Sequence, residues 1–227
     1  MKLTVFGATG GVGGEAVRQA LAAGHEVTAV VRDPARLDAR GTGLEVVRSA
    51  LESPDELVAA VAGRDAVLSG LGVANKAQAR TGLAERLTRT VLAALAAAGT
   101  RRLVVVSAAP LAPPAPGTGL LDRAMLGAID TLLKPVYEDL RAMERLLRES
   151  DTAWTPVRPP RLTNGPLTGT YRTAVDANPP RAAPSAARTS PTRCSGRPTT
   201  RPSRATRWAW RTDLAPRGRP GPTCTAR

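Results

Sequence analysis

The chain has 227 residues, 42% of them hydrophobic, and its 32 Lys and Arg residues against 19 Asp and Glu residues give a formal net charge of +13. Both cysteines, Cys194 and Cys224, lie in the last 49 residues, so the preceding sequence excludes disulfides, thiol catalysis and cysteine-based metal sites, and we expect no metal. No apolar run has transmembrane length, and the apolar N-terminus leads into a glycine turn instead of a signal peptide, which favours a soluble, cytoplasmic protein.

The first predicted elements are a strand over Lys2–Phe6 and a helix over residues 15–23, joined by a glycine-rich turn. The glycines have the spacing G-x-x-G-x-x-G, a variant of the dinucleotide-binding fingerprint. Glycine lets the backbone approach a pyrophosphate, and the helix N-terminus attracts the phosphates. We therefore predict cofactor contacts here, and the alternative is an ordinary strand-helix turn. The predicted contacts are Gly7, Thr9, Gly10, Gly11, Val12 and Gly13.

The residues after the second predicted strand, 25–31, indicate which dinucleotide binds. Arg32 occupies the position where an acidic residue would accept hydrogen bonds from the adenosine ribose, and Arg36 follows four residues later. A guanidinium can instead form charge-assisted bonds with a 2′-phosphate. We therefore predict NADP(H), with NAD(H) possible. In the alternative interpretation, both arginines belong to a solvated helix start, and Asp33 as its N-cap fits either one.

The rest of residues 1–178 continues the alternation of strands and helices. It predicts helices over residues 54–62, 78–98 and 136–150, and strands over residues 44–47, Ala66–Ser69, 102–107, 154–158 and 170–175. This pattern predicts an α/β fold with a Rossmann-like, doubly wound parallel sheet. Ligands of such sheets bind beyond the carboxyl ends of the strands. One cleft should therefore collect Gly7, Arg32, residues 70–72 with Leu71 and Gly72, residues 107–109 with Ser107 and Ala108, and residues 159–162 with Pro159.

Several further stretches make residues 1–178 resemble an atypical short-chain dehydrogenase. They are Gly7-Ala8-Thr9-Gly10, Val31-Arg32-Asp33, residues 63–67, 103–107, 143–150 and 165–171, and Val157-Arg158-Pro159-Pro160. The chain is most similar to the NAD(P)H-binding, NmrA-like group that includes the flavin reductase/biliverdin-IXβ reductase type. This resemblance implies NADPH on the glycine turn and hydride transfer to a flavin, quinone or tetrapyrrole-like acceptor. It also implies Ser107 beside the nicotinamide, and Pro159, Pro160 and Leu162 along the acceptor.

Two features depart from the family pattern. Members commonly carry Gly-Asp after the third strand, whereas residues 47–50 read Val-Arg-Ser-Ala, which leaves the adenine contact open. The Tyr-x-x-x-Lys of standard short-chain dehydrogenases is replaced by Tyr137-x-x-x-Arg141, whose guanidinium stays protonated and has a different shape. Tyr137 and Ser107 are the candidate catalytic residues, with hydride transfer by proximity and the proton taken from water or Ser107. His25 precedes a strand, far from the cleft, and is not expected to be catalytic.

Residues 179–227 form a tail of different composition, with 11 arginines, nine prolines and one acidic residue, Asp213. Such a segment cannot bury a core and is expected to be disordered. Arg, Pro, Thr, Ser and Ala are also what GC-rich codons yield in a wrong reading frame. Re-read in another frame, residues 189–202 are compatible with an amphipathic helix and residues 203–211 with a terminal strand. We therefore hypothesise a frameshift between residues 178 and 187; the alternative is a genuine basic extension, for which nucleic-acid binding is a weaker interpretation.

Two classes of function remain open. The first is an NADPH-dependent reductase of a small aromatic acceptor, its activity impaired if the tail is out of frame. The second is a non-catalytic NAD(P)-sensing regulator that acts through protein partners, because NmrA-like proteins include members that bind dinucleotide without turnover. We expect a monomer or homodimer with no membrane partner.

Overall fold

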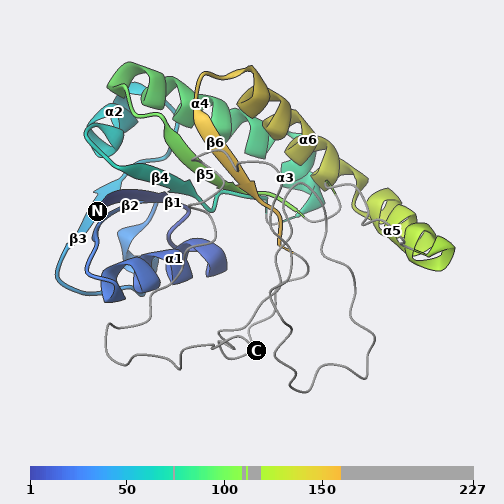
Figure 1. Ribbon diagram of the computed structural model, residues 1–227, viewed down its shortest axis with the longest axis horizontal. Helices are drawn as coiled ribbons and strands as arrows, with labels where there is room; N and C mark the ends of the chain where they lie inside the picture. Colours follow the sequence, from blue (N-terminus) through green and yellow to red (C-terminus); the bar gives the residue numbers. More distant parts are fainter. Residues whose placement is uncertain (74, 109–110, 112–118, 160–227) are drawn as a thin grey trace, which may run out of the picture.

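The computed structural model describes residues 1–73, 75–108, 111 and 119–159. A six-stranded parallel sheet with strand order β3-β2-β1-β4-β5-β6 forms its centre (Figure 1). This arrangement confirms the predicted α/β Rossmann-like fold. The strands are β1 (Lys2–Phe6), β2 (Glu26–Val31), β3 (Leu44–Arg48), β4 (Ala66–Ser69), β5 (Arg102–Val106) and β6 (Ala153–Val157).

Helices cover both faces of the sheet. On one face, α1 (Gly11–Ala22) packs below the sheet in Figure 1. On the other face lie α2 (Asp55–Val61), α4 (Leu83–Ala98) and α6 (Lys134–Glu149). Three further helical segments are the short η1 (Pro34–Arg36), α3 (Lys76–Arg80) and α5 (Leu120–Leu132), the last of which extends away from the sheet. No helix in these described ranges is long and apolar enough to cross a membrane.

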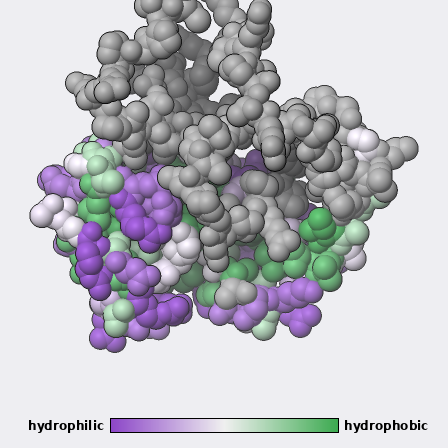
Figure 2. All heavy atoms as spheres, turned by 90° about the horizontal axis from the view of Figure 1, so that it is seen from below, coloured by the Kyte–Doolittle hydropathy of each residue, from purple (hydrophilic) through white to green (hydrophobic). Residues whose placement is uncertain are grey.

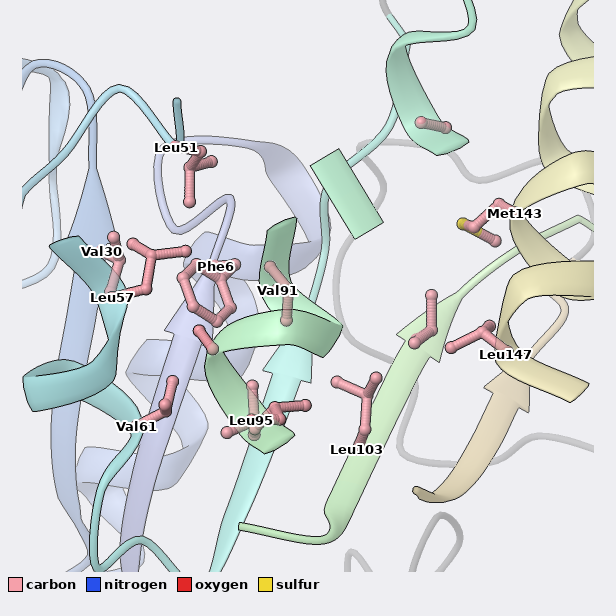
Figure 3. Close-up of a cluster of buried hydrophobic side chains, with 14 of the residues drawn as sticks. Phe6, Val30, Leu51, Leu57, Val61, Val91, Leu95, Leu103, Met143 and Leu147 are labelled. Atoms are coloured by element: carbon pink, nitrogen blue, oxygen red, sulfur yellow. The ribbon is translucent and has the colours of Figure 1, made fainter. Parts of the chain in front are cut away.

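Alternation along β1 divides the core into two layers. Leu3 and Val5 point toward α1, where they join a buried cluster with Val17 and Val27. Phe6 points to the opposite face and joins a larger cluster beneath α2, α4 and α6 (Figure 3). Each face of the sheet is therefore closed by its own hydrophobic layer. Seen from below, the coloured surface intersperses hydrophilic and hydrophobic residues (Figure 2).

The structure corrects one predicted helix and adds another. The single helix expected over residues 78–98 is instead two helices, because Gly82 adopts the left-handed conformation at φ 62° and ends one before the next begins. Helix α5 was not predicted. Strands β1 and β4 have the predicted bounds, and α1 begins four residues earlier than predicted, at Gly11. The strand predicted at residues 170–175 and the tail lie outside the described residues.

Helix α6 is fastened to α4 by a buried carboxylate. Asp139 accepts hydrogen bonds of 3.0 Å from the backbone N–H groups of Ala84 and Glu85. The N-cap residue of α4, Gly82, has no side chain to accept them, so a residue 55 positions away in the sequence satisfies the helix start. This contact fastens α6 to the start of α4.

Candidate functional site

Three glycines bring three backbone segments into direct contact at the carboxyl ends of β1 and β4. Gly7 has φ +73°, and a Cβ atom on it would lie 2.8 Å from the carbonyl group of Gly70. A Cβ on Gly13 would lie 2.2 Å from the Gly7 oxygen, and one on Gly70 would lie 3.1 Å from the Gly13 nitrogen. Side chains at these positions would force the segments apart. The glycine turn therefore packs against both the start of α1 and the loop after β4.

The N-terminus of α1 forms the floor of this turn. Gly10 is its N-cap, in an extended conformation and without a side-chain capping bond, and the first turn contains no acidic residue. The amide of Gly14 bonds to the Gly10 oxygen at 2.8 Å, so the amides of Gly11, Val12 and Gly13 precede the first helical hydrogen bond. Free N–H groups and the helix dipole favour an anion here. The cradle thus fits the phosphates of a dinucleotide.

A cleft of about 170 Å³ opens beside the glycine turn. Its lining joins the turn to two arginines and an aspartate from elsewhere: Ala8, Thr9, Gly10, Gly11, Gly14, Arg18, Arg36, Asp38 and Ala39. Asp33 accepts a hydrogen bond from the Ala35 amide at 3.1 Å, which confirms it as the cap of η1. Arg36, the last residue of η1, lines the same cleft as Thr9 and Gly10.

Arg18 and Asp38 were not anticipated from the sequence. Arg18 lies two helical turns after Gly10 on α1, so the helical period could have placed it near the turn. Glu15 holds its guanidinium with hydrogen bonds of 2.6 and 3.1 Å. Asp38 reaches the cleft only through the path of the loop after η1, for which the sequence gives no periodic signal.

Arg32 lies at the end of β2, outside the lining of this cleft. Its side chain is exposed, and it follows Val31, which stands opposite Arg48 in the register of β2 with β3. Two arginines therefore lie on neighbouring strand ends, at the carboxyl edge where sheets of this kind bind dinucleotides. Within the described part of the chain, neither forms a salt bridge.

At the end of β5, Ser107 belongs to a buried network of charged groups. Its hydroxyl donates a 2.7 Å hydrogen bond to Oε1 of Glu144, a residue of α6 that is only 2% exposed. Arg158 donates to both carboxylate oxygens, at 3.0 and 2.7 Å, and Arg148 donates to Oε2 at 3.0 Å. Sequence reasoning did not find Glu144 or its arginines as a site, because their contacts join three elements separated along the chain.

The network keeps Glu144 ionised. Burial by itself raises the pKa of this carboxyl, but hydrogen bonds from Arg158 and Ser107 and the charges of Arg158 and Arg148 outweigh it. The pKa of Glu144 is therefore lowered from its ordinary value of 4.5. At neutral pH the carboxylate can only accept hydrogen bonds.

Tyr137 lies on α6 seven residues before Glu144, about 10 Å farther along the helix axis. Burial raises the pKa of its phenol above the ordinary 10.0, and the negative charge of Asp130 raises it further, against a smaller opposite effect of Arg141. Arg141 forms a salt bridge with Asp130. The pair Tyr137 and Arg141 therefore lacks the pKa-lowering arrangement of Tyr-x-x-x-Lys.

The other predicted positions follow the ends of β4, β5 and β6. Leu71 and Ala108 are partly buried against the larger core cluster, and a Cβ on Gly72 would meet no atom within 4 Å. Pro159 is two residues beyond β6, and the predicted Pro160 and Leu162 lie outside the described residues. Because β1, β4 and β5 are neighbours in the sheet, Ser107 stands two strand spacings, about 10 Å, from the glycine turn.

The opposite end of the sheet has different features. His25 precedes β2 there, and burial together with the N-terminal ammonium group lowers its pKa. A cavity of about 320 Å³ lies at the amino ends of β2 and β3, lined by residues that include Glu26, Glu45 and Arg64. Open α/β sheets bind ligands at the carboxyl ends of their strands, so we assign the site to the glycine turn. Among the described residues, no group of three or more His, Cys, Asp or Glu side chains could hold a metal ion.

The chain is similar to several known proteins. A curated relative from Streptomyces griseus subsp. griseus, a (4-alkanoyl-5-oxo-2,5-dihydrofuran-3-yl)methyl phosphate reductase, is 36% identical over 157 residues. The match covers 69% of this chain and 46% of that protein, so the chain spans less than half of the relative's length.

Two solved structures share both fold and sequence with the chain. One is a candidate NADH-flavin reductase from Streptococcus pneumoniae, at 29% identity and a TM-score of 0.62 over 78% of this chain and 81% of that one. The other is a candidate epimerase from Bacteroides thetaiotaomicron, at 28% identity and a TM-score of 0.61 over 78% and 79%. The profile of the NAD(P)H-binding family matches residues 7–190. The chain therefore belongs to this NAD(P)H-binding family of atypical short-chain dehydrogenases/reductases.

Proposed function

We propose that the protein is an NADPH-dependent oxidoreductase that transfers hydride to a flat, conjugated acceptor such as a flavin, quinone or tetrapyrrole. The observation that carries the proposal is the uncapped N-terminus of α1 beside a cleft lined by Arg18 and Arg36. Amides and a helix dipole bind the pyrophosphate, and guanidinium groups suit a 2′-phosphate. Two of the similar proteins are described as reductases, one of them a candidate for flavin.

The order of strands sets the orientation of the dinucleotide. With the pyrophosphate at Gly10 and Gly11, the adenosine half extends toward Arg36 and the end of β2. The nicotinamide half then extends across the ends of β4 and β5, past Leu71 and Gly72 to Ser107. The bound nicotinamide supplies the hydride, and the protein holds it against the acceptor.

Neither candidate acid is suited to supply a proton. The hydroxyl proton of Ser107 is donated to Glu144, and the raised pKa of Tyr137 makes its phenol a weak acid. A conjugated acceptor spreads the incoming negative charge over its ring system, so water can protonate it after hydride transfer. The lack of a proton donor among these two described candidates therefore favours flavins and quinones over isolated ketones as acceptors.

Two measurements test the proposal. Dinucleotide binding is followed by the fluorescence of NADPH, and turnover by the loss of NADPH absorbance with FMN or a soluble quinone. We expect both signals in the unchanged protein and neither in Gly10→Val, since its side chain would crowd the pyrophosphate and its Cβ would lie 3.3 Å from the Gly7 oxygen. Absence of NADPH binding to the folded, unchanged protein would refute the proposal.

A second candidate function is a non-catalytic NAD(P) sensor that acts through protein partners. The observation in its favour is the pairing of Arg141 with Asp130: burial and the Asp130 charge raise the pKa of Tyr137 more than Arg141 lowers it, so the phenol is not activated as an acid. Tight binding of NADPH with no turnover of any flavin or quinone would favour the sensor. Turnover with one of them would favour the reductase.

A further inference from the structure

The hydrogen bonds around Glu144 determine whether the Ser107 hydroxyl can donate a hydrogen bond to a ligand or accept one from it. Within the described residues, Oε1 of Glu144 accepts from Ser107 and from Nε of Arg158, and Oε2 accepts from Arg158 and Arg148. The exposed fraction of the side chain is 2% for Glu144 and 19% for Arg158, so solvent does not compete strongly for these bonds. A carboxylate held by four donors is fixed in position and charge.

A serine hydroxyl has one proton and two lone pairs. Because the ionised Glu144 can only accept, the single proton of Ser107 points toward α6 at a donor–acceptor distance of 2.7 Å. Transfer of this proton to a ligand would leave an alkoxide beside a carboxylate, which is electrostatically unfavourable. The remaining capacity of the hydroxyl is therefore that of a hydrogen-bond acceptor.

We infer that Glu144 is a positioning residue that fixes Ser107 as a hydrogen-bond acceptor for an N–H or O–H group on the nicotinamide half of the dinucleotide. Two groups there have this chemistry, the carboxamide amine and the ribose hydroxyls. The inference rests on the proposed binding mode and goes beyond it, because it assigns Ser107 to recognition and removes it from proton donation. Arg158 and Arg148 act on Ser107 indirectly, because they hold the Glu144 carboxylate that bonds to the serine.

The experiment measures NADP⁺ binding by calorimetry, which needs no turnover. Ser107→Ala removes the acceptor, and Glu144→Gln allows the serine proton to turn away from α6. We expect each change to weaken NADP⁺ binding by about tenfold, the size of one lost hydrogen bond. The double variant should be no weaker than Ser107→Ala alone, because Glu144 acts through the serine.

Two controls separate this effect from loss of stability. Thr100→Val removes another buried hydroxyl, which donates to the Val61 oxygen at 2.7 Å before the opposite end of β5. It should lower the melting temperature without changing NADP⁺ binding. If Glu144→Gln does not fold, Glu144→Asp keeps a charge for Arg158 and Arg148 while withdrawing the carboxylate from Ser107, and it should weaken binding in the same way.

An analogue identifies the donor. The 3-acetylpyridine form of NADP⁺ has no N–H on its ring substituent. If the carboxamide is the donor, the unchanged protein binds this analogue about tenfold more weakly than NADP⁺, and Ser107→Ala binds both equally. If a ribose hydroxyl is the donor, Ser107→Ala weakens both ligands to the same extent.

Two results would overturn the inference. One is unchanged NADP⁺ affinity in folded Ser107→Ala, and the other is a further tenfold loss when Glu144→Gln is added to Ser107→Ala. A failure of the unchanged protein to bind NADP⁺ would instead count against the proposed function, so the two failures are distinguishable.

Discussion

Gly13 and Gly7 lie so close that a Cβ atom on Gly13 would stand 2.2 Å from the carbonyl oxygen of Gly7. The start of α1 therefore rests directly on the end of β1, and the Gly10 amide closes the turn with a 2.9 Å bond to the same oxygen. Because the glycine turn is built from this contact, its geometry depends on the absence of a side chain at Gly13.

The contact predicts that Gly13→Ala is destabilising. The added methyl must displace backbone, and we expect a loss of about 1–3 kcal/mol in the free energy of unfolding, together with loss of NADPH binding. Gly11→Ala is the matched change, since a Cβ there meets no atom within 4 Å. Urea unfolding should show Gly11→Ala at least as stable as the unchanged protein. Equal stability of the two variants would contradict the packing argument.

Cofactor choice should depend on the arginines of the cleft. Arg36→Ala is expected to weaken NADPH binding by about 1.5–3 kcal/mol, the range for hydrogen bonds to charged groups, and to change NADH binding little. Arg32→Asp should also weaken NADPH binding, but by less, because Arg32 lies outside the cleft lining. Arg86→Ala, an exposed change on α4, serves as control. Equal affinities of the unchanged protein for NADPH and NADH would disprove this preference.

The cap between α6 and α4 should contribute measurably to stability. Asp139→Ala removes both acceptors from the start of α4, and we expect a loss of about 1–2 kcal/mol in urea unfolding. Asp139→Asn keeps one oxygen and should lose less. The control is Glu138→Ala, its exposed neighbour 3.8 Å from Lys134, with an expected effect of less than about 0.5 kcal/mol. A similar loss in Glu138→Ala would show that the cap is not responsible.

Lowering the pH should destabilise the folded protein, because it protonates Glu144. Its pKa is lowered in the folded state, so its stabilising contribution is present above the ordinary value of 4.5 and is lost as the pH falls through the lower, folded-state value. We expect the free energy of unfolding to decrease below pH 4.5, and to decrease less steeply in Glu144→Gln. The measurement is urea unfolding at a series of pH values from 5.5 to about 3, the range in which paired carboxylates titrate. Parallel curves for the two proteins would exclude Glu144 as a major contributor.

The composition of residues 179–227 predicts an out-of-frame segment. Trypsin should remove this tail rapidly by cleaving after those of its arginines that are not followed by proline, and deletion of the tail should leave the melting temperature nearly unchanged. Restoring the frame should raise the melting temperature, because the re-read segment is compatible with a helix and a strand that would complete the fold. Nucleotide sequencing of codons 175–190 tests the origin directly. Unfolding of residues 1–178 on deletion of the tail would contradict the frameshift hypothesis.

Local features of the sequence were enough to predict the parallel sheet and the glycine turn. Strand β1 has the predicted bounds because an apolar run next to a glycine turn has few alternative conformations. The division of residues 78–98 was missed because Gly82 alone does not show whether it will adopt a left-handed conformation inside an Ala-rich and Leu-rich segment. Helix α5 was missed because it follows a stretch with Pro110, Pro113, Pro114 and Pro116, and prolines favour irregular structure.

The sequence by itself determined the fold class and the place of the glycine turn, since both depend on residue types at short, fixed spacings. Only the tertiary structure decided which groups complete the site. Arg18 and Arg36 line the same cleft although they come from α1 and η1, and Ser107 bonds to Glu144 on α6, 37 residues later in the chain. Contacts of this kind depend on the path of the whole chain, and hydrophobic periodicity, which reports only the buried face of each element, does not encode them.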